Sequence, residues 1–280
     1  MKEIEVSRLS QYLQIIEENN SKFQRKQRFL YRGESMLSYT LLPSVYRKTE
    51  DGLGSEVYLS KSSERSILTD FMTEAASYIN GVPVDDMFRW VEYAQHFGVP
   101  TRLLDWTSNP LVALFFACSS NPNEDGRIYI LNQLFYRLLV DENDRNSMEG
   151  RIIKEEALKM ILEEKNTFPY PVLFKPYYFD PRLQAQSSYF MAWGYKKEPL
   201  DALINELEEG KAKAIEYLAI SEETAGDGIE VITDIHIKNE YKAHLKRELD
   251  GIGINNATLF PGLDGIGRCI EWRNNVKSFS

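Results

Sequence analysis

Side chains capable of chemistry gather between Tyr93 and Ala117, between two apolar helical patterns. They are His96, Arg102, Asp105, Trp106, Thr107 and Ser108. Burying such groups without partners is costly. They therefore either satisfy one another in a structural network or line a binding site.

Trp106, Thr107 and Ser108 stand just before a predicted helix. Pro110 suits the first helical position, and Asn109 or Ser108 can cap it. Free backbone N–H groups and the positive end of the helix dipole would favour an anionic ligand there, above all a phosphate. A capped helix that binds nothing is the alternative.

The spacing of Arg102 and Asp105, three residues apart beside two leucines, predicts a buried ion pair. His96 stands near a predicted helix C-terminus, where the dipole would favour its cationic form. A structural histidine is the plainer interpretation, and a hydrolase using His96 with Asp105 is an alternative function. Because the chain has three histidines and no nearby cysteine here, we expect no metal site.

Two further sites for ligand contact lie outside this stretch. Arg32 follows a predicted buried strand and could clamp a phosphate or carboxylate, or pair with Glu34. Gln184 and Gln186 would point to one face of a strand, where two amides could bind a ribose or a base edge. Two exposed glutamines are the alternative.

These motifs resemble those of the FRG domain family, which occurs in bacteria and their phages. The stretch QHFGVPTRLLDWT at 95–107 is the most specific of them, and Tyr31-Arg32-Gly33 stands where the family has Phe-Arg-Gly. The resemblance spans roughly residues 23–270. It implies a single domain over 1–280, with a signature core at about 23–190 and helical and β elaboration at about 191–280. Ser188 departs from the pattern, which leads us to expect Gly.

A more distant resemblance is to ADP-ribosyltransferases of the Arg-Ser-Glu type. It implies an α+β fold with a mixed or antiparallel β core and flanking helices, and NAD as the substrate without a metal. The catalytic residues it implies are Arg32, Thr107, Ser108 and Gln186, and the cofactor-binding residues are Arg32, Gly33, Trp106, Thr107, Ser108 and Gln184, with support from His96, Arg102 and Asp105.

This resemblance implies transfer of ADP-ribose to a macromolecule or cleavage of NAD, for instance in a conflict between phage and host. Gln186 is neutral where the transferases carry Glu, and losing such an electrostatic contribution costs about 10²- to 10³-fold in rate. Asp105 is the best local carboxylate to replace it. A nucleotide-sensing or interaction module without turnover is the alternative.

The elements that must position these residues follow from hydrophobic periodicity. We expect strands at 29–31, 126–131 and 229–237, and helices at 7–19, 62–80, 85–97, 110–117, 149–165, 198–209 and 239–250. Residues 38–47 are predicted extended and 49–56 a loop. The four prolines and many aromatic residues of 168–193 favour extended or irregular backbone over helix. A last strand-to-helix unit is predicted from Thr258 to near Asn275. Without repeats, one α+β domain is the simplest architecture.

The composition of the chain limits the classes of partner that we expect the protein to bind. The formal net charge is −9 and no sustained Lys/Arg run occurs, so we expect no non-specific nucleic-acid binding. No window is apolar enough to span a membrane, and the N-terminus lacks the apolar region of a signal peptide. Cys118 and Cys269 stand in apolar contexts typical of buried thiols, which favours a reducing cytoplasm. The expected partners are a nucleotide and a macromolecular acceptor.

Overall fold

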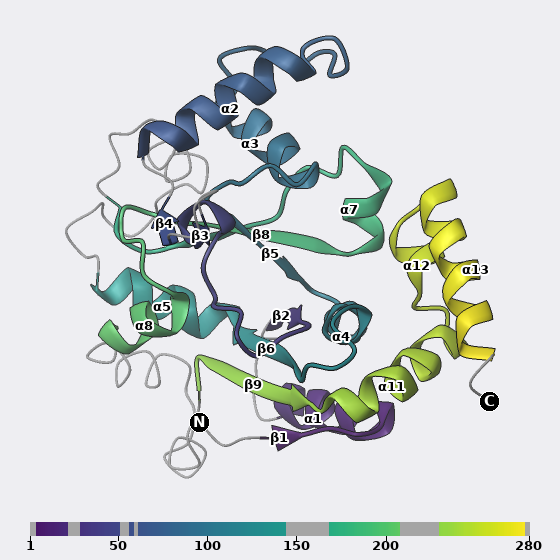
Figure 1. The fold of residues 1–280 in the computed structure, drawn as a ribbon. Helices are drawn as coiled ribbons and strands as arrows, with labels where there is room; N and C mark the ends of the chain where they lie inside the picture. Colours follow the sequence, from purple (N-terminus) through teal and green to yellow (C-terminus); the bar gives the residue numbers. More distant parts are fainter. Residues whose placement is uncertain are drawn as a thin grey trace.

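A mixed seven-stranded sheet forms the centre of the protein (Figure 1). The structure is a computed structural model that describes residues 4–21, 29–50, 56–58, 61–143, 168–207 and 230–277. The strand order is β1-β9-β6-β2-β5-β8-β7, with β1 parallel to β9 and the other pairs antiparallel. The bounds are β1 Ile4–Glu5, β2 Phe29–Glu34, β5 Leu103–Thr107, β6 Gly126–Asn132, β7 Val172–Phe174, β8 Ser188–Ala192 and β9 Ile232–Ile237. The α+β class and mixed sheet are confirmed.

Helices cover both faces of this sheet. One core packs α1 (Leu9–Ser21), α4 (Pro110–Ser119) and α11 (Asn239–Gly251) on one face. A second core packs α5 (Gln133–Asn143) and α8 (Leu200–Glu206) on the other. The remaining elements are α2 (Lys61–Ala75), α3 (Met87–His96), α7 (Pro181–Ala185), α12 (Asn256–Leu259), α13 (Leu263–Lys277), a 3-10 turn at Ser44–Tyr46, and the hairpin of β3 (Lys48–Glu50) and β4 (Glu56–Tyr58).

The sheet opens between β2 and β5. Tyr31 and Thr107 are the single register pair that joins these strands, whereas β2 and β6 pair from Phe29 to Glu34. Beyond this joint, the Arg32 guanidinium reaches across and donates from Nη1 to the carbonyl oxygen of Asp105 at 2.7 Å. The sheet therefore consists of two well-bonded halves, β1-β9-β6-β2 and β5-β8-β7, which are joined by one register pair and by the Arg32–Asp105 hydrogen bond.

Helix α4 begins as its sequence predicts. The Asn109 side chain accepts from the backbone N–H of Leu111, and Pro110 occupies the first turn. The helix is apolar on nearly every side because it crosses the centre of the sheet. The crossing is so close at Gly33 that a Cβ there would lie 1.8 Å from the carbonyl oxygen of Ala113.

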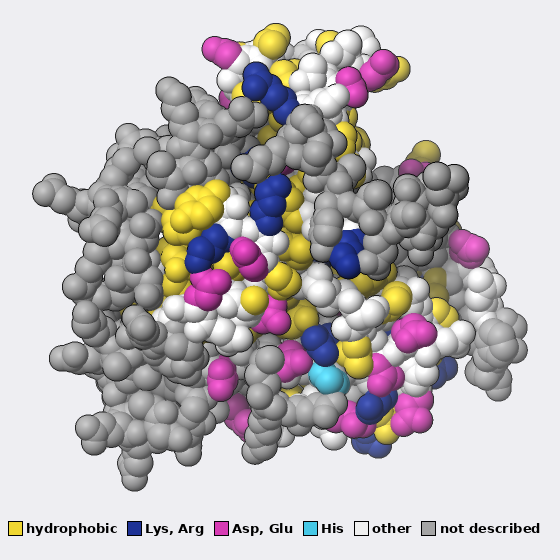
Figure 2. Space-filling view, turned by 60° about the vertical axis from the view of Figure 1, so that its left-hand side comes forward, with side chains coloured by type: hydrophobic (Ala, Val, Ile, Leu, Met, Phe, Trp, Pro, Cys, Tyr) yellow, Lys and Arg dark blue, Asp and Glu magenta, His cyan; other side chains and the backbone are white. Residues whose placement is uncertain are grey.

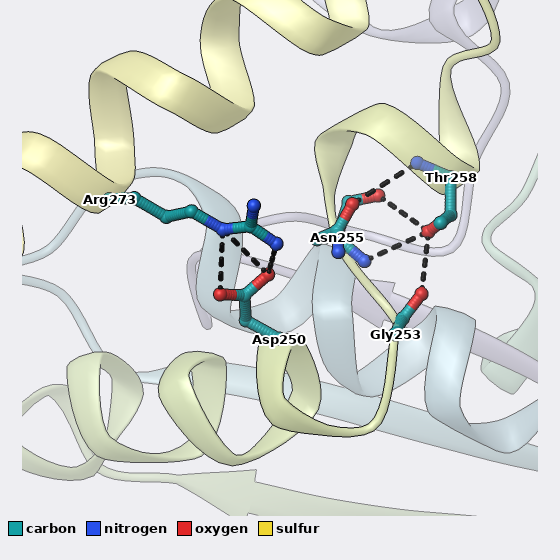
Figure 3. A network of polar contacts seen from close by, with 5 residues as sticks. All are labelled: Asp250, Gly253, Asn255, Thr258 and Arg273. Atoms are coloured by element: carbon teal, nitrogen blue, oxygen red, sulfur yellow. Dashed lines mark hydrogen bonds and ion pairs between the residues drawn. The ribbon is translucent and has the colours of Figure 1, made fainter.

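Several predicted boundaries are wrong for local reasons. Residues 168–193 hold the expected extended backbone in β7 and β8, but also the helix α7, which was not predicted. Residues 258–261 form no strand. Asn255 and Thr258 instead make a reciprocal capping box that starts α12 (Figure 3). Asp86 caps the start of α3, and Gly98, at φ +80°, follows the end of this helix. Within 49–56, predicted as a loop, the described residues Thr49, Glu50 and Glu56 belong to the paired strands β3 and β4. The predicted helix at 149–165 lies outside the described residues.

None of the helices in the described ranges combines the length and the apolar character that crossing a bilayer requires. Cys118 and Cys269 are both buried, as expected. Burial raises the pKa of the Cys118 thiol to about 12, which keeps it protonated and unreactive.

Candidate functional site

A cavity of about 560 Å³ lies where the sheet opens. Its floor comes from β2, β5 and β8, and its walls come from the end of α3, from α4 and from α7. The lining residues are Tyr31, Arg32, Gly33, Gln95, His96, Phe97, Gly98, Asp105, Trp106, Thr107, Val112, Phe116, Arg182, Leu183, Gln186, Ser188 and Phe190. Most of the residues selected from sequence therefore meet at one place.

Arg32 is held at the joint by two contacts. Its Nε lies 3.0 Å from Oε1 of the buried Glu34, so the predicted alternative partner is present. Its Nη1 donates to the Asp105 carbonyl across the opening of the sheet. With the Arg32 side chain 16% exposed, the guanidinium is fixed in place and still lines the cavity.

Asp105 is the exposed residue of β5, and its carboxylate faces the cavity. Its Oδ2 accepts from Nε2 of Gln95 at 2.7 Å. Gln95 in turn accepts at Oε1 from the hydroxyl of the buried Thr101. The Asp105 carboxylate is therefore accessible and oriented.

The predicted ion pair between Arg102 and Asp105 is wrong. Neighbouring side chains alternate between the two faces of a strand, but position 102 stands before β5 begins, and its side chain reaches α2. There Nε and Nη2 of Arg102 each donate to the Glu64 carboxylate at 2.7 Å. Arg102 does not line the cavity, and its role is to fasten α2 to the start of β5.

Replacing Arg102 with Ala is expected to lower the free energy of unfolding by about 1–3 kcal/mol, because the largely buried Glu64 carboxylate loses two hydrogen bonds and its ion-pair partner. Both side chains are 16% exposed, so water cannot fully replace the lost bonds. Urea denaturation measures the change. Arg273→Ala removes a similar fork from Asp250, but that arginine is 47% exposed (Figure 3), and a loss of about 0–1 kcal/mol is expected. Equal losses in the two variants would contradict this account.

His96 lines the cavity beside the rings of Phe97 and Phe179. Its Nε2 lies 3.4 Å from Oδ2 of Asp180, and its side chain is 6% exposed. Burial lowers the pKa of His96 and outweighs the opposing effect of Asp180, so burial favours the neutral imidazole over the cation expected from the helix dipole. A pairing of His96 with Asp105 as a hydrolase dyad has less support than its pairing with Asp180.

This burial predicts an acid-sensitive fold. Because the folded state holds the His96 proton less tightly than the unfolded chain, stability falls as the pH drops below about 6.5, the ordinary pKa of histidine. His96→Gln removes the titrating group, so its free energy of unfolding should fall less between about pH 7 and pH 5. Thermal melts across this range test the difference, and parallel curves for the two proteins would exclude it.

Thr107 and Ser108 separate at the helix start. The Thr107 hydroxyl donates to the carbonyl of Gln186 at 2.7 Å and accepts from the amide of Asn109, so its bonding is internal. Ser108 does not line the main cavity. It borders a second cavity of about 450 Å³ formed with Ile16, Asn20, Phe29, Leu30, Tyr31, Pro110 and Tyr189.

The two glutamines do not share a strand face, because α7 occupies residues 181–185 and Gln186 is its C-cap. Gln184 is exposed and lines neither cavity. Gln186 lines the main cavity, but its amide donates to the carbonyl of Leu259 at 3.0 Å. Ser187 then turns with φ +49°, an uncommon value for a residue with a side chain.

Gly33 and Trp106 complete the floor of the cavity. Gly33 is required by the closeness of α4, independently of any ligand. Trp106 is 3% exposed, and its Nε1 has no hydrogen-bond partner among the residues that the structure describes.

Arg182 is the residue of the site that sequence reasoning missed as a ligand group. It lines the cavity, and its guanidinium lies 4.7 Å from the centre of the Phe260 ring. Burial lowers the pKa of Arg182, while Asp105 and Asp180 oppose that shift. Its place after Asp180-Pro181, which cap and begin a short helix, is the one local signal that could have marked it.

The C-terminal helices hold this wall in place. Leu259 and Phe260, which contact Gln186 and Arg182, follow the Asn255–Thr258 capping box. Figure 3 shows that box beside the ion pair of Asp250 and Arg273, which ties α11 to α13. The segment after 250 therefore supports the wall formed by Arg182 and Gln186 without lining the cavity itself.

Other site types have less support in the described part of the chain. No group of three His, Cys, Asp or Glu residues able to hold a metal occurs there. On the face shown in Figure 2, Lys and Arg side chains are interspersed with Asp and Glu side chains.

The comparisons with known proteins address the sequence motifs of this site. No curated protein and no solved structure matches the chain. The family model of the FRG domain matches residues 27–126, which include Arg32, Gln95 and Asp105. Arg182 and Gln186 lie outside the matched range. Residues 27–126 of this chain are thus an FRG domain.

Proposed function

We propose that the cavity binds NAD and that the protein transfers its ADP-ribose group or hydrolyses NAD, in the manner of an ADP-ribosyltransferase. The observation that carries the proposal is the meeting of two guanidinium groups, Arg32 and Arg182, with the accessible carboxylate of Asp105 in one cavity. Its volume of about 560 Å³ falls in the range of about 300–1,000 Å³ typical of small-molecule sites.

Each group has a distinct role in this proposal. Arg32 and Arg182 bind the diphosphate, because a planar guanidinium donates two parallel hydrogen bonds to phosphate oxygens. The apolar lining from Trp106, Phe116 and Phe97 suits the flat rings of a dinucleotide. Thr107 acts indirectly, since its hydroxyl fixes the backbone at Gln186.

The reaction breaks the bond between C1′ of the ribose and the nicotinamide nitrogen, and the electron pair leaves with nicotinamide. The ribose then carries positive charge, and water or a nucleophile of a macromolecular acceptor attacks C1′ and loses its proton. The Asp105 carboxylate stabilises this charge in the proposal. Gln186 is neutral and donates its amide to Leu259, so it does not supply that charge.

A nucleotide-binding module without turnover is the second candidate. The observation in its favour is Gln186, which stands where the transferases that the chain resembles carry a charged Glu. Both candidates need the same cavity, and they differ in whether nicotinamide is released.

The test combines calorimetry with NAD and chromatographic measurement of nicotinamide release from the full chain. Arg182→Gln is expected to weaken NAD binding by about 10- to 100-fold, because it removes a charge-assisted contact. Arg8→Gln, an exposed arginine that lines neither cavity, is the matched control and should bind like the wild type. Binding with release supports the transferase or hydrolase, and binding without release supports the sensing module. No heat with NAD or ADP-ribose would overturn both.

A further inference from the structure

We infer that Gln95 is a positioning residue that orients the Asp105 carboxylate toward the ligand. The inference rests on the proposed function for the role of Asp105, but its geometry stands apart from it. The two residues come from different elements, the end of α3 and the middle of β5. A turn through Gly98, at φ +80°, brings them together.

The orientation of the Gln95 amide follows from a chain of hydrogen bonds. The backbone N–H of Leu103 donates to the Thr101 hydroxyl at 3.1 Å, and that hydroxyl lies 2.5 Å from Oε1 of Gln95. A threonine hydroxyl has one proton, and a glutamine oxygen can only accept. Because the Asp105 carboxylate can only accept, the Gln95 amide nitrogen faces Asp105, and Oε1 accepts the single proton of the Thr101 hydroxyl.

This series of hydrogen bonds runs from the core to the cavity. Thr101 is 4% exposed and its hydroxyl accepts from the backbone N–H of Leu103, so it anchors the buried end. Gln95 is half-buried, and Asp105 is the exposed end. Because Nε2 of Gln95 holds Oδ2 at 2.7 Å, the plane of the carboxylate is set before any ligand arrives.

A neutral donor suits this position. Asp105 already interacts electrostatically with Arg182, His96 and Arg47, and its own carbonyl accepts from Arg32. Another cation in place of Gln95 would neutralise the charge that the proposed reaction needs. An amide orients the carboxylate and leaves its charge available, which is preorganisation without neutralisation.

The test measures kcat and KM for NAD consumption in Gln95→Leu, Thr101→Val and the double variant. Gln95→Leu should lower kcat by about 10- to 100-fold and leave KM within about threefold, since it disturbs the reacting geometry and not the diphosphate contacts. Thr101→Val should lower kcat in the same way. The double variant should be no worse than Gln95→Leu, because the two residues act as one unit.

Gln14→Leu is the matched control. Gln14 on α1 also donates its amide to a carboxylate, Glu18 at 3.0 Å, but on the exposed surface away from both cavities. Its kcat should equal that of the wild type. A Gln95→Leu protein with wild-type kcat, or one whose KM rises as much as kcat falls, would overturn the inference.

A second measurement needs no turnover. The side-chain amide protons of Gln95, assigned by their loss in Gln95→Leu, should shift in NMR spectra of both Asp105→Asn and Thr101→Val without ligand. Unchanged resonances would refute the hydrogen-bond chain. Shifted resonances in a protein that neither binds nor consumes NAD would support the hydrogen bonds between Thr101, Gln95 and Asp105 and would overturn the proposed function.

Discussion

Replacing Asp105 with Asn is expected to lower NAD turnover by about 10²- to 10³-fold while the protein remains folded. Asn has the same shape and keeps an oxygen toward Gln95, but it has no charge to stabilise the positive ribose. The side chain is exposed, so the free energy of unfolding should change by less than about 1 kcal/mol. Nicotinamide release and a thermal melt on the same sample measure both effects.

Asp70→Asn is the matched control for this change. Asp70 is an exposed aspartate on α2 that does not line the main cavity, and its replacement should alter neither quantity. If Asp105→Asn retained wild-type turnover, the carboxylate would have no part in the reaction. If it unfolded the protein, the interpretation of the segment as a structural network would be favoured instead.

Replacing Gly33 with Ala is expected to destabilise the protein by about 1–3 kcal/mol or more, as overpacking of a core does. The added Cβ would lie 1.8 Å from the carbonyl oxygen of Ala113 and 2.8 Å from the backbone nitrogen of Ala117. Both are backbone atoms of α4, a helix packed in the core against the sheet, so no side-chain rotation relieves the clash. Urea denaturation measures the loss.

Gly267→Ala separates this clash from a general effect of removing glycine. Gly267 lies in α13 with nothing within 4 Å of an added Cβ, so the change should be neutral or stabilise by up to about 1 kcal/mol. Equal losses in the two variants would show that the approach of α4 is less tight than described. The triplet Tyr31-Arg32-Gly33 thus combines a candidate ligand group with a packing requirement.

Local signals predicted the elements that local chemistry controls. The start of α4 followed from Asn109 and Pro110, because capping involves residues within one turn. The strands at 29 and 126 followed from short apolar runs bounded by polar residues. The short α7 was missed, because four prolines and many aromatic residues favour extended or irregular backbone over helix, whereas Asp180 and Pro181 cap and begin a helix there.

Long-range pairing limited what the sequence predicted about the site. The partner of Arg102 is Glu64, on a helix 38 residues away, and spacing within one segment pointed to Asp105 instead. Arg182 reaches the cavity because Phe260, 78 positions later, lies under its guanidinium. Arg32, Thr107 and Gln186, which were selected by their order along the chain, do line one cavity. However, the Thr107 hydroxyl and the Gln186 amide donate to backbone carbonyl groups of the protein.

The single register pair between β2 and β5 makes this the weakest strand pairing of the central sheet. The amides of the β2–β6 and β5–β8 ladders should exchange with deuterium slowly. Amides of β2 and β5 that face the opening beyond the Tyr31–Thr107 pair should exchange faster, because no ladder partner protects them there. A ligand that contacts Arg32 on β2 and Asp105 on β5 would stabilise the joint between these two strands and slow that exchange. The ligand would then form a further connection between the two halves of the sheet, and its binding would be measurable as slower deuterium exchange at the joint.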